Sequence, residues 1–185
     1  MRRLYSQRHP LSRQPKIRHG ARPNVKSLPR LLLGPVRGTL AVNSYKVFPA
    51  AITREQAKSF KVGYCKFDDP VILDLVELIK TEYPDITTVK PSYCRVEDRL
   101  EGHPWHRDTG STGHMRWCYL SARLLLSNPE TFKGGGFYFR DDPKTPHYGH
   151  LDLMVYTAAD HEHMVCSHSG TREVLLMFFA KASEL

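Results

Sequence analysis

The first 54 residues contain no aspartate or glutamate, although they carry twelve lysines and arginines. The rest of the chain holds fifteen basic and nineteen acidic residues, so the whole positive excess behind the formal net charge of +8 lies in this first segment. The segment also lacks the apolar spacing of a helix or strand, and such a segment buries too little apolar surface to fold alone. Residues 1–52 are therefore predicted to form an extended, basic and largely irregular N-terminal arm.

Cysteines are scarce, and no two of them form a C-x-x-C pair. The four are Cys65, Cys94, Cys118 and Cys166. This spacing favours neither a zinc site nor a disulfide scaffold. Free thiols are typical of a reducing intracellular compartment, and we expect the cytoplasm.

Long hydrophobic runs are also missing. No apolar stretch approaches the roughly 20 residues of a membrane-spanning helix, and no membrane partner is expected. A length of 185 residues, a hydrophobic content of 41% and a mean hydropathy of −0.44 fit one soluble globular domain. We assign this domain to residues 53–185.

The basic segment, residues 1–54, is compatible with three roles. Its lysines and arginines match the phosphates of a nucleic acid. An extended basic strap also fits docking onto a large assembly such as a virion or ribonucleoprotein particle, which is the reading we favour. An arginine-rich N-terminus without acidic residues is typical of a mitochondrial transit segment as well.

Two helices are predicted ahead of the β-rich region. Thr53-Arg54-Glu55-Gln56 has the form of a capping box and predicts a short helix to about residue 61. Asp69 as N-cap and Pro70 at the first helical position predict a second helix, which ends at Tyr83-Pro84. Apolar residues recur along it at helical spacing, so it is expected to cover one face of a sheet.

Short strands dominate from residue 86 onward, separated by clusters of Gly, Pro and Asp. The predicted strands are 86–96, 115–127, 135–140, 150–157, 161–167 and 172–180. Many short strands behind a helical lead-in indicate a mainly β fold with supporting helices, and a jelly-roll barrel in particular.

Two histidines and one aspartate carry the chemistry. In His106-Arg107-Asp108 the first and third side chains point the same way if the segment is an extended strand, so both reach one metal ion. His163 is expected to begin another strand and to supply the third ligand. Two imidazoles and one carboxylate hold non-haem Fe(II) on one face and leave three positions open.

Arg172 follows His163 by nine residues, after a turn predicted at Ser169-Gly170. It begins the strand that continues through residues 174–179, a run that is apolar on both faces. A charged side chain at the start of a buried strand needs a partner, and a guanidinium binds a carboxylate through two parallel hydrogen bonds. Arg172 is expected in the metal cavity, with a surface salt bridge as the alternative.

These residues form part of a pattern that spans residues 90 to 180. It comprises the H-x-D, an R-x-x-x-S strand ending in Leu-Ser-Asn-Pro, a glycine pair before an aromatic strand, and a distal H-x-V followed by G-x-R. The stretch resembles the 2-oxoglutarate- and Fe(II)-dependent dioxygenases and, among them, the prolyl-4-hydroxylase-like group.

The resemblance implies a double-stranded β-helix, the jelly roll also found in cupins. It implies that His106, Asp108 and His163 bind Fe(II) and that Arg172 binds the distal carboxylate of 2-oxoglutarate, which is the cosubstrate together with O2; ascorbate is a further expected cofactor. The implied reaction hydroxylates a peptide or protein substrate, foremost a peptidyl proline, and releases succinate and CO2. A nucleic-acid base is the second candidate substrate, because of the basic arm.

Departures from the family pattern concern the cosubstrate pocket. The group commonly has a tyrosine before the glycine pair, where an ungapped match places Leu125. Arg123 faces the same way, so an extra cation is expected near the cosubstrate or in a salt bridge at the barrel mouth. Phe178 shares a strand face with Arg172 and is expected to line the pocket, although core packing explains it equally well. Tyr93 is assigned as the pocket tyrosine, three residues farther from the H-x-D than usual.

The remaining histidines are less informative. His161 and His168 lie near His163, but the interval to Arg172 selects His163. His161 is expected to contact substrate or water or to lie solvated at a strand edge, and His168 to fall in a turn. Exposed loop positions are predicted for four others, His103, His114, His147 and His150.

Gly134-Gly135-Gly136 precedes an aromatic strand and has no P-loop lysine after it, so phosphate binding is not expected. The glycines are predicted to allow a tight turn and a close backbone approach at the barrel mouth. Trp105 and Trp117 flank the H-x-D segment and are expected either to shape the substrate entrance or to fill the core.

A different class of function fits part of the sequence. The small size, the basic arm and the missing tyrosine also suit a structural or adaptor protein that retains the oxygenase fold within a viral or ribonucleoprotein assembly. The complete metal triad and Arg172 favour the enzyme. Metal binding separates the two, because an adaptor has no need to keep iron.

Overall fold

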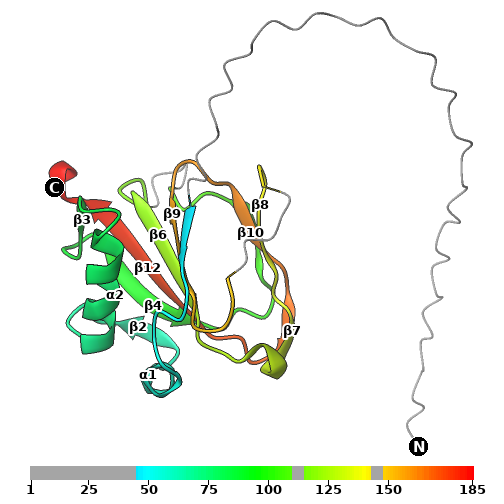
Figure 1. Ribbon diagram of the computed structural model, residues 1–185. Coiled ribbons are helices and arrows are strands. Elements are labelled where there is room, and N and C mark those ends of the chain that lie inside the picture. Colours follow the sequence, from blue (N-terminus) through cyan, green and yellow to red (C-terminus); the bar gives the residue numbers. More distant parts are fainter. Residues whose placement is uncertain (1–44, 110–114, 143–147) are drawn as a thin grey trace, which may run out of the picture. The chain divides into compact units, whose positions relative to one another are not determined.

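The computed structural model describes residues 45–109, 115–142 and 148–185 (Figure 1). Their helices are α1 (Arg54–Ser59) and α2 (Pro70–Lys80), with 3-10 turns η1 (Pro129–Thr131) and η2 (Ala182–Glu184). The strands are β1 (Tyr45–Phe48), β2 (Gly63–Cys65), β3 (Ile86–Thr87), β4 (Tyr93–Glu97), β5 (His103–His106), β6 (Leu120–Leu125), β7 (Phe132–Gly134), β8 (Phe137–Phe139), β9 (Leu153–Thr157), β10 (His163–Val165), β11 (His168–Gly170) and β12 (Val174–Lys181).

A large antiparallel sheet forms the centre of the domain. Its strands run in the order β1-β9-β6-β12-β4-β2, with β3 paired to the far end of β12. Two smaller sheets, β5-β10-β8 and β11-β7, lie across from it. Figure 1 shows α2 on one side of the large sheet and β8 and β10 on the other, so the strands enclose an interior in the manner of a jelly roll. The predicted fold class is confirmed.

The two faces of the large sheet have different residues, because side chains alternate along a strand. Leu120, Leu124 and Leu175 point outward and form the main core with α2, whose Ile72 and Ile79 are fully buried against them. The opposite face carries polar and aromatic side chains into the barrel: Ser121, Arg123, Tyr156 and Phe178. One face of the large sheet therefore packs against a hydrophobic core, and the other lines a cavity with polar and aromatic side chains.

The helix starts follow the predicted caps. Thr53 and Gln56 form the reciprocal hydrogen bonds of a capping box, and Asp69 Oδ1 accepts from the backbone N–H groups of Val71 and Ile72. Both helices end earlier than expected, at Ser59 and Lys80. In the described part of the chain, no helix is long and apolar enough to cross a membrane.

The large sheet begins inside the segment that was predicted to be an arm. β1 pairs antiparallel with β9 from Tyr45↔Tyr156 to Phe48↔Leu153 and forms an edge of the sheet. The predicted boundary at residue 52 therefore lies too far along the chain. Short strands with mixed burial, such as β1, lack the long apolar alternation that identifies a strand in a sequence. Residues 1–44 of the arm lie outside the described residues.

Several short strands were not predicted. β2, β5 and β7 have three or four residues each, and the turn expected at Ser169-Gly170 is wrong, because these residues belong to β11 and pair with β7. The predicted strand 86–96 is interrupted between β3 and β4, where the Lys90-Pro91 bond is cis.

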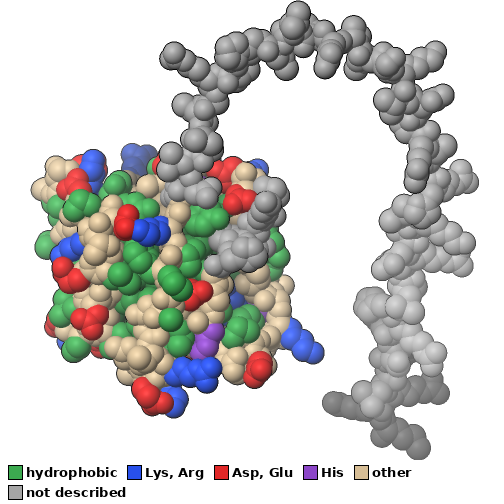
Figure 2. Space-filling model, viewed as in Figure 1, with side chains coloured by type: hydrophobic (Ala, Val, Ile, Leu, Met, Phe, Trp, Pro, Cys, Tyr) green, Lys and Arg blue, Asp and Glu red, His purple; other side chains and the backbone are tan. Residues whose placement is uncertain are grey.

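On the face shown in Figure 2, basic and acidic side chains of the described residues are interspersed rather than gathered by sign.

Candidate metal centre

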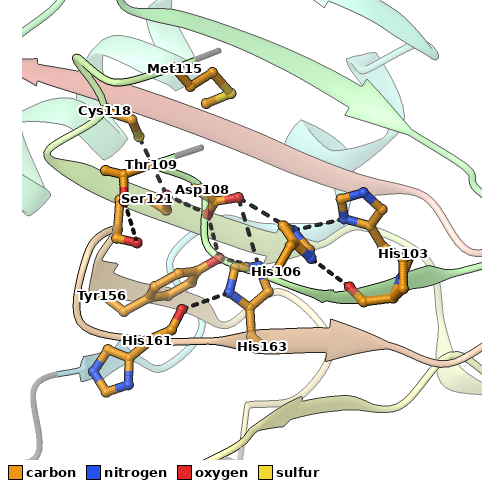
Figure 3. Close-up of polar contacts among 12 residues, drawn as sticks. His103, His106, Asp108, Thr109, Met115, Cys118, Ser121, Tyr156, His161 and His163 are labelled. Carbon is orange, nitrogen blue, oxygen red and sulfur yellow. Dashed lines mark hydrogen bonds and ion pairs between the residues drawn. The ribbon is translucent and has the colours of Figure 1, made fainter. Parts of the chain in front are cut away.

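The H-x-D pair and the distal histidine meet at the junction of β5 and β10. His106 ends β5 and lies opposite His163, the first residue of β10. Asp108 follows two residues later. It lies just beyond the end of the strand, whereas the sequence predicted a position on the strand. Its Oδ1 lies 3.5 Å from His106 Nε2 and 3.7 Å from His163 Nε2 (Figure 3). One ligand atom from each residue lies within 4.8 Å of the others, so the three can hold one metal ion.

Backbone carbonyls orient both imidazoles. His106 Nδ1 lies 2.7 Å from the carbonyl oxygen of Pro104, and His163 Nδ1 lies 3.2 Å from that of His161. A carbonyl can only accept a hydrogen bond, so Nδ1 carries the proton in each ring. In the neutral ring each Nε2 then has a lone pair on the side of Asp108, and this is the form that binds a metal.

The carboxylate of Asp108 is held from its other side. Ser121 Oγ donates a 2.6 Å hydrogen bond to Oδ2, and Tyr156 Oη donates one of 3.1 Å to the same oxygen (Figure 3). Burial acts to raise the pKa of Asp108, but the contact with His106, the charge of His163 and the Ser121 hydrogen bond outweigh it and lower the pKa to about 2. Asp108 is therefore a carboxylate at neutral pH, with Oδ1 available for a cation.

Burial also sets the state of His163. Its side chain is 3% exposed, and desolvation lowers its pKa to about 4 although the nearby Asp108 acts in the opposite direction. Burial raises the pKa of Tyr156 well above its usual value, so the phenol keeps its proton for Asp108. The neutral imidazole of His163 and the ionised carboxylate of Asp108, together with the imidazole of His106, form a donor set suited to a divalent transition metal.

A cavity of about 680 Å³ opens beside these residues. Besides the three candidate ligands, its lining includes all four side chains that were predicted to bind the cosubstrate: Tyr93, Arg123, Arg172 and Phe178. The cavity is large enough for a small dicarboxylate and part of a second molecule.

Arg172 lies in the connection between β11 and β12 rather than on a strand, and it is 6% exposed. Its Nη2 donates to Tyr148 Oη at 3.5 Å, and burial lowers its pKa. No salt bridge joins it to an acid among the described residues, so the alternative of a surface ion pair is wrong. The guanidinium therefore faces the cavity without a carboxylate of its own.

Gly135 explains how the Arg172 side chain reaches this position. The glycine has a φ of +69°, and a Cβ at this site would lie 2.3 Å from Arg172 Cδ. Gly134 also has a positive φ, of +87°. The predicted close backbone approach is confirmed, because a Cβ at Gly134 would lie 2.5 Å from the carbonyl oxygen of Ser167. The predicted tight turn is not found, because Gly134 ends β7 and Gly135 and Gly136 form an irregular connection to β8.

Arg123 is a second buried cation in the cavity, with an exposure of 4%. Its guanidinium carbon lies 3.8 Å from the centre of the Phe137 ring and 5.7 Å from that of Tyr148. Its Nε has no hydrogen-bond partner, and no described acidic residue forms a salt bridge with it, so the predicted alternative of a salt bridge is wrong. Two arginines thus share one end of the cavity with the hydroxyl of Tyr148.

Aromatic side chains form the other wall. Tyr93 packs against Phe178 at a ring distance of 5.0 Å and against Trp117 at 5.9 Å. Exposed Tyr64 continues the row at 5.9 Å from Tyr93. Trp105 lies at the mouth on β5, where Arg140 stacks on it and pairs with Glu162.

The other histidines differ from their predicted places. His161 is buried between Tyr45, Phe139 and Tyr156, so it is not solvated at a strand edge. His168 lies on β11 rather than in a turn, with Nε2 2.7 Å from Asp98 Oδ1. His103 is half-buried on β5 beside His106, and burial lowers its pKa to about 4.

His150 also departs from the exposed loop position predicted for it. It is half-buried, and its Nε2 lies 3.1 Å from the carbonyl oxygen of Leu126. His114 and His147 lie outside the described residues.

Four residues of the site were not found from the sequence: His103, Ser121, Tyr148 and Tyr156. Ser121 had a usable signal, because it shares a strand face with Arg123. His103 and Tyr156 are brought to the site by strand pairing between distant segments, and Tyr148 by an irregular segment, which spacing within one segment does not reveal.

Comparisons with known proteins show the fold. No protein-family model matches the sequence, and neither does any curated protein. Among solved structures, a prolyl-4-hydroxylase from Pseudomonas putida is 12% identical, with 77% of this chain and 95% of that one covered and a TM-score of 0.57. A viral collagen prolyl hydroxylase from Paramecium Bursaria Chlorella virus-1, solved with 2OG, is 10% identical over 78% and 99% of the two chains, with a TM-score of 0.57.

A third similar structure is a prolyl hydroxylase from Trichoplax adhaerens in complex with a peptide fragment of the hypoxia inducible factor oxygen degradation domain. It is 9% identical over 77% of this chain and 86% of that one, with a TM-score of 0.58. The fold of this chain is thus that of the prolyl hydroxylases, and the resemblance predicted from the sequence is confirmed at that level.

Proposed function

We propose that this protein is an Fe(II)- and 2-oxoglutarate-dependent oxygenase that hydroxylates its substrate and releases succinate and CO2. The observation that carries this proposal is the meeting of His106, Asp108 and His163, whose ligand atoms lie within 4.8 Å of one another inside a prolyl-hydroxylase fold. The donor set fits Fe(II), because two neutral imidazoles and one carboxylate form the facial triad of non-haem iron oxygenases. When bound, the iron supplies the oxidising chemistry together with 2-oxoglutarate and O2.

The two buried arginines are the residues that we assign to the cosubstrate. Arg172 and Arg123 lie at the same end of the cavity as the Tyr148 hydroxyl, and neither has an acidic partner among the described residues. A buried cation is stable only when it is paired, and the distal carboxylate of 2-oxoglutarate provides that pairing through charge-assisted hydrogen bonds. Phe178 and Tyr93 pack along the opposite wall, where they exclude water and limit the room beside the cosubstrate.

A peptide is the substrate that we propose, and a peptidyl proline in particular. Trp105, Tyr64 and Tyr93 line the cavity, and Trp117 packs behind Tyr93. Aromatic-lined grooves accept proline-rich segments, which are already extended before they bind. A structure of the same fold, from Trichoplax adhaerens, is a complex with a peptide fragment.

The basic arm is assigned an acidic partner, either a nucleic acid or a protein assembly. Its support is the charge of residues 1–54, twelve basic and no acidic side chains. If phosphates are the partner, affinity for a DNA or RNA oligonucleotide falls steeply as the salt concentration rises, and deletion of residues 1–44 removes that dependence. A salt-independent affinity would exclude this assignment.

The oxygenase is tested by titrating Fe(II) and 2-oxoglutarate into the protein without oxygen. Chelation of the iron by the cosubstrate gives a weak visible charge-transfer band, which we expect in the wild-type protein and not in His106→Ala. His150→Ala is the matched control, because it also loses one imidazole but lies outside the cavity lining. Absence of the band from the wild-type protein would exclude the oxygenase and leave the adaptor function.

A further inference from the structure

His103 is directed toward the candidate metal centre by an irregularity in β5. On β10, His163 pairs with His106 and Val165 pairs with His103. These two pairs are two residues apart on β10 but three residues apart on β5. One extra residue is therefore accommodated at Pro104-Trp105, which is the count of a β-bulge. Residues three apart on a regular strand point to opposite faces. The extra residue turns His103 to the same side as His106, and their ring centres lie 3.6 Å apart.

The two rings touch through the nitrogen that a metal needs. His103 Nδ1 lies 2.7 Å from His106 Nε2 (Figure 3). A neutral imidazole carries one N–H, and Nδ1 of His106 uses it to donate to the carbonyl of Pro104, so Nε2 of the neutral ring has no proton. His103 Nδ1 must therefore be the donor, and in the metal-free protein it covers the lone pair of His106. A metal ion that takes this lone pair breaks the hydrogen bond and leaves His103 Nδ1 beside it.

The separation of the two nitrogens is close to that of neighbouring ligands. Metal–nitrogen bonds of about 2.1 Å place adjacent donors of an octahedron about 3 Å apart. His103 Nδ1 and His106 Nε2 lie 2.7 Å apart, closer to this value than the 3.5 Å between His106 Nε2 and Asp108 Oδ1. Both histidines line the same cavity, and no carboxylate within salt-bridge distance draws the His103 ring elsewhere among the described residues.

We propose that His103 is a fourth protein ligand of the metal before the cosubstrate binds. It coordinates through Nδ1 once its proton has moved to Nε2, and it takes one of the three positions that the triad leaves open. The proposal rests on the metal site of the proposed function. A chelating cosubstrate takes two of these positions and O2 takes the third, so His103 has to withdraw before O2 can bind. His103 thereby fills the resting centre and competes with O2 for the last position.

Electron paramagnetic resonance of the Cu(II)-loaded protein tests the proposal without turnover, because it counts coordinated imidazole nitrogens. We expect three in the wild-type protein, two in His103→Ala and in His103→Phe, and three in the matched control His150→Ala. His103→Phe keeps an aromatic ring in the place of the imidazole, and thermal unfolding of each variant checks that it is folded. Metal affinity is expected to fall about 10-fold in both His103 variants.

The cosubstrate gives a second readout. Addition of 2-oxoglutarate to the Cu(II) protein is expected to leave the count at three in the wild type, because the chelate takes only two of the open positions, and at two in His103→Ala. Two nitrogens in the wild type, reduced to one in His106→Ala but unchanged in His103→Ala, would overturn the role of His103 and leave the metal site intact. A wild-type signal without coordinated imidazole, unaltered in His106→Ala, would overturn the metal site and this proposal together.

Discussion

Ser121 Oγ donates a 2.6 Å hydrogen bond to Asp108 Oδ2, the oxygen that faces away from the two histidine ligand nitrogens. Ser121 lies on β6 in the middle of the large sheet, whereas Asp108 lies on the connection after β5. The sheet therefore determines which oxygen of a loop carboxylate is left for the metal. Tyr156, from neighbouring β9, donates to the same oxygen at 3.1 Å.

Replacing Ser121 with alanine is expected to lower metal affinity about 10-fold, because residues that orient a metal ligand typically contribute this much. Calorimetric titration of Mn(II), as a stand-in for Fe(II), measures the change. Tyr156→Phe, which removes the longer hydrogen bond, is expected to have a smaller effect. Ser59→Ala is the control, since that hydroxyl is exposed on α1 and bonds only to its own helix. Equal affinity in Ser121→Ala and wild type would show that the carboxylate needs no second support.

Gly135→Ala is expected to weaken 2-oxoglutarate binding by displacing Arg172. The new Cβ would lie 2.3 Å from Arg172 Cδ and 2.5 Å from Nε, and a φ of +69° strains any residue with a side chain. We expect an increase of 10-fold or more, on the order of one charge-assisted hydrogen bond, in the 2-oxoglutarate concentration that half-saturates the charge-transfer band. In the control Gly149→Ala, the Cβ meets only Asp152 Oδ2 at 3.4 Å. An unaltered requirement in Gly135→Ala would place the cosubstrate away from Arg172.

Replacing Arg123 with methionine is expected to change 2-oxoglutarate affinity and thermal stability in opposite directions. The variant loses a cation that is 4% exposed and without a described acidic partner, so the metal- and cosubstrate-free protein is expected to unfold at a higher temperature. Its affinity for 2-oxoglutarate is expected to fall by about 10- to 100-fold, the range for a lost hydrogen bond to a charged group. Arg54→Met, on the exposed start of α1, should alter neither quantity strongly. A lower unfolding temperature with full affinity would make Arg123 a structural residue.

Much of the fold could be predicted from the sequence, because the helix caps and the apolar strands are each formed by residues close together in the chain. The caps at Thr53 and Asp69 consist of neighbours in the chain, and β6, β9 and β12 are apolar enough on one or both faces to be recognised alone. The same holds for the H-x-D, whose two ligands are two residues apart. What failed were short strands such as β1 and β11, since three or four residues of mixed burial have no periodicity to detect.

Only part of the site could be predicted from the sequence, because some of its residues are brought together by contacts between distant segments. Each predicted residue was identified by type and spacing, and the structure places all of them around one cavity. Tyr148 and Tyr156 could not be identified in this way, because both contact residues that are far away in the chain: β-sheet register brings Tyr156 to the site, and an irregular segment brings Tyr148. His103 was misjudged as an exposed loop residue, because a bulge that reverses the direction of one side chain leaves no mark in the apolar pattern.

The metal-free protein is expected to lose stability in mild acid. His163 has a folded-state pKa of about 4 against a usual value of 6.5, because burial disfavours the charged ring. Between these values the unfolded chain binds a proton that the folded protein excludes, so its stabilising contribution is complete above pH 6.5 and decreases as the pH falls toward 4. For this one group the loss between about pH 7 and pH 5 is about 2 kcal/mol.

Urea unfolding in the presence of a chelator at these two pH values measures the loss. His163→Gln is expected to lack this part of it, because a glutamine at this position does not titrate. His150→Gln, a half-buried histidine outside the cavity, is the control and should keep the wild-type dependence. If His163→Gln and the wild-type protein lost the same free energy, the imidazole would already be accessible to protons in the folded state. That result would be incompatible with a buried ligand nitrogen whose lone pair is reserved for a metal.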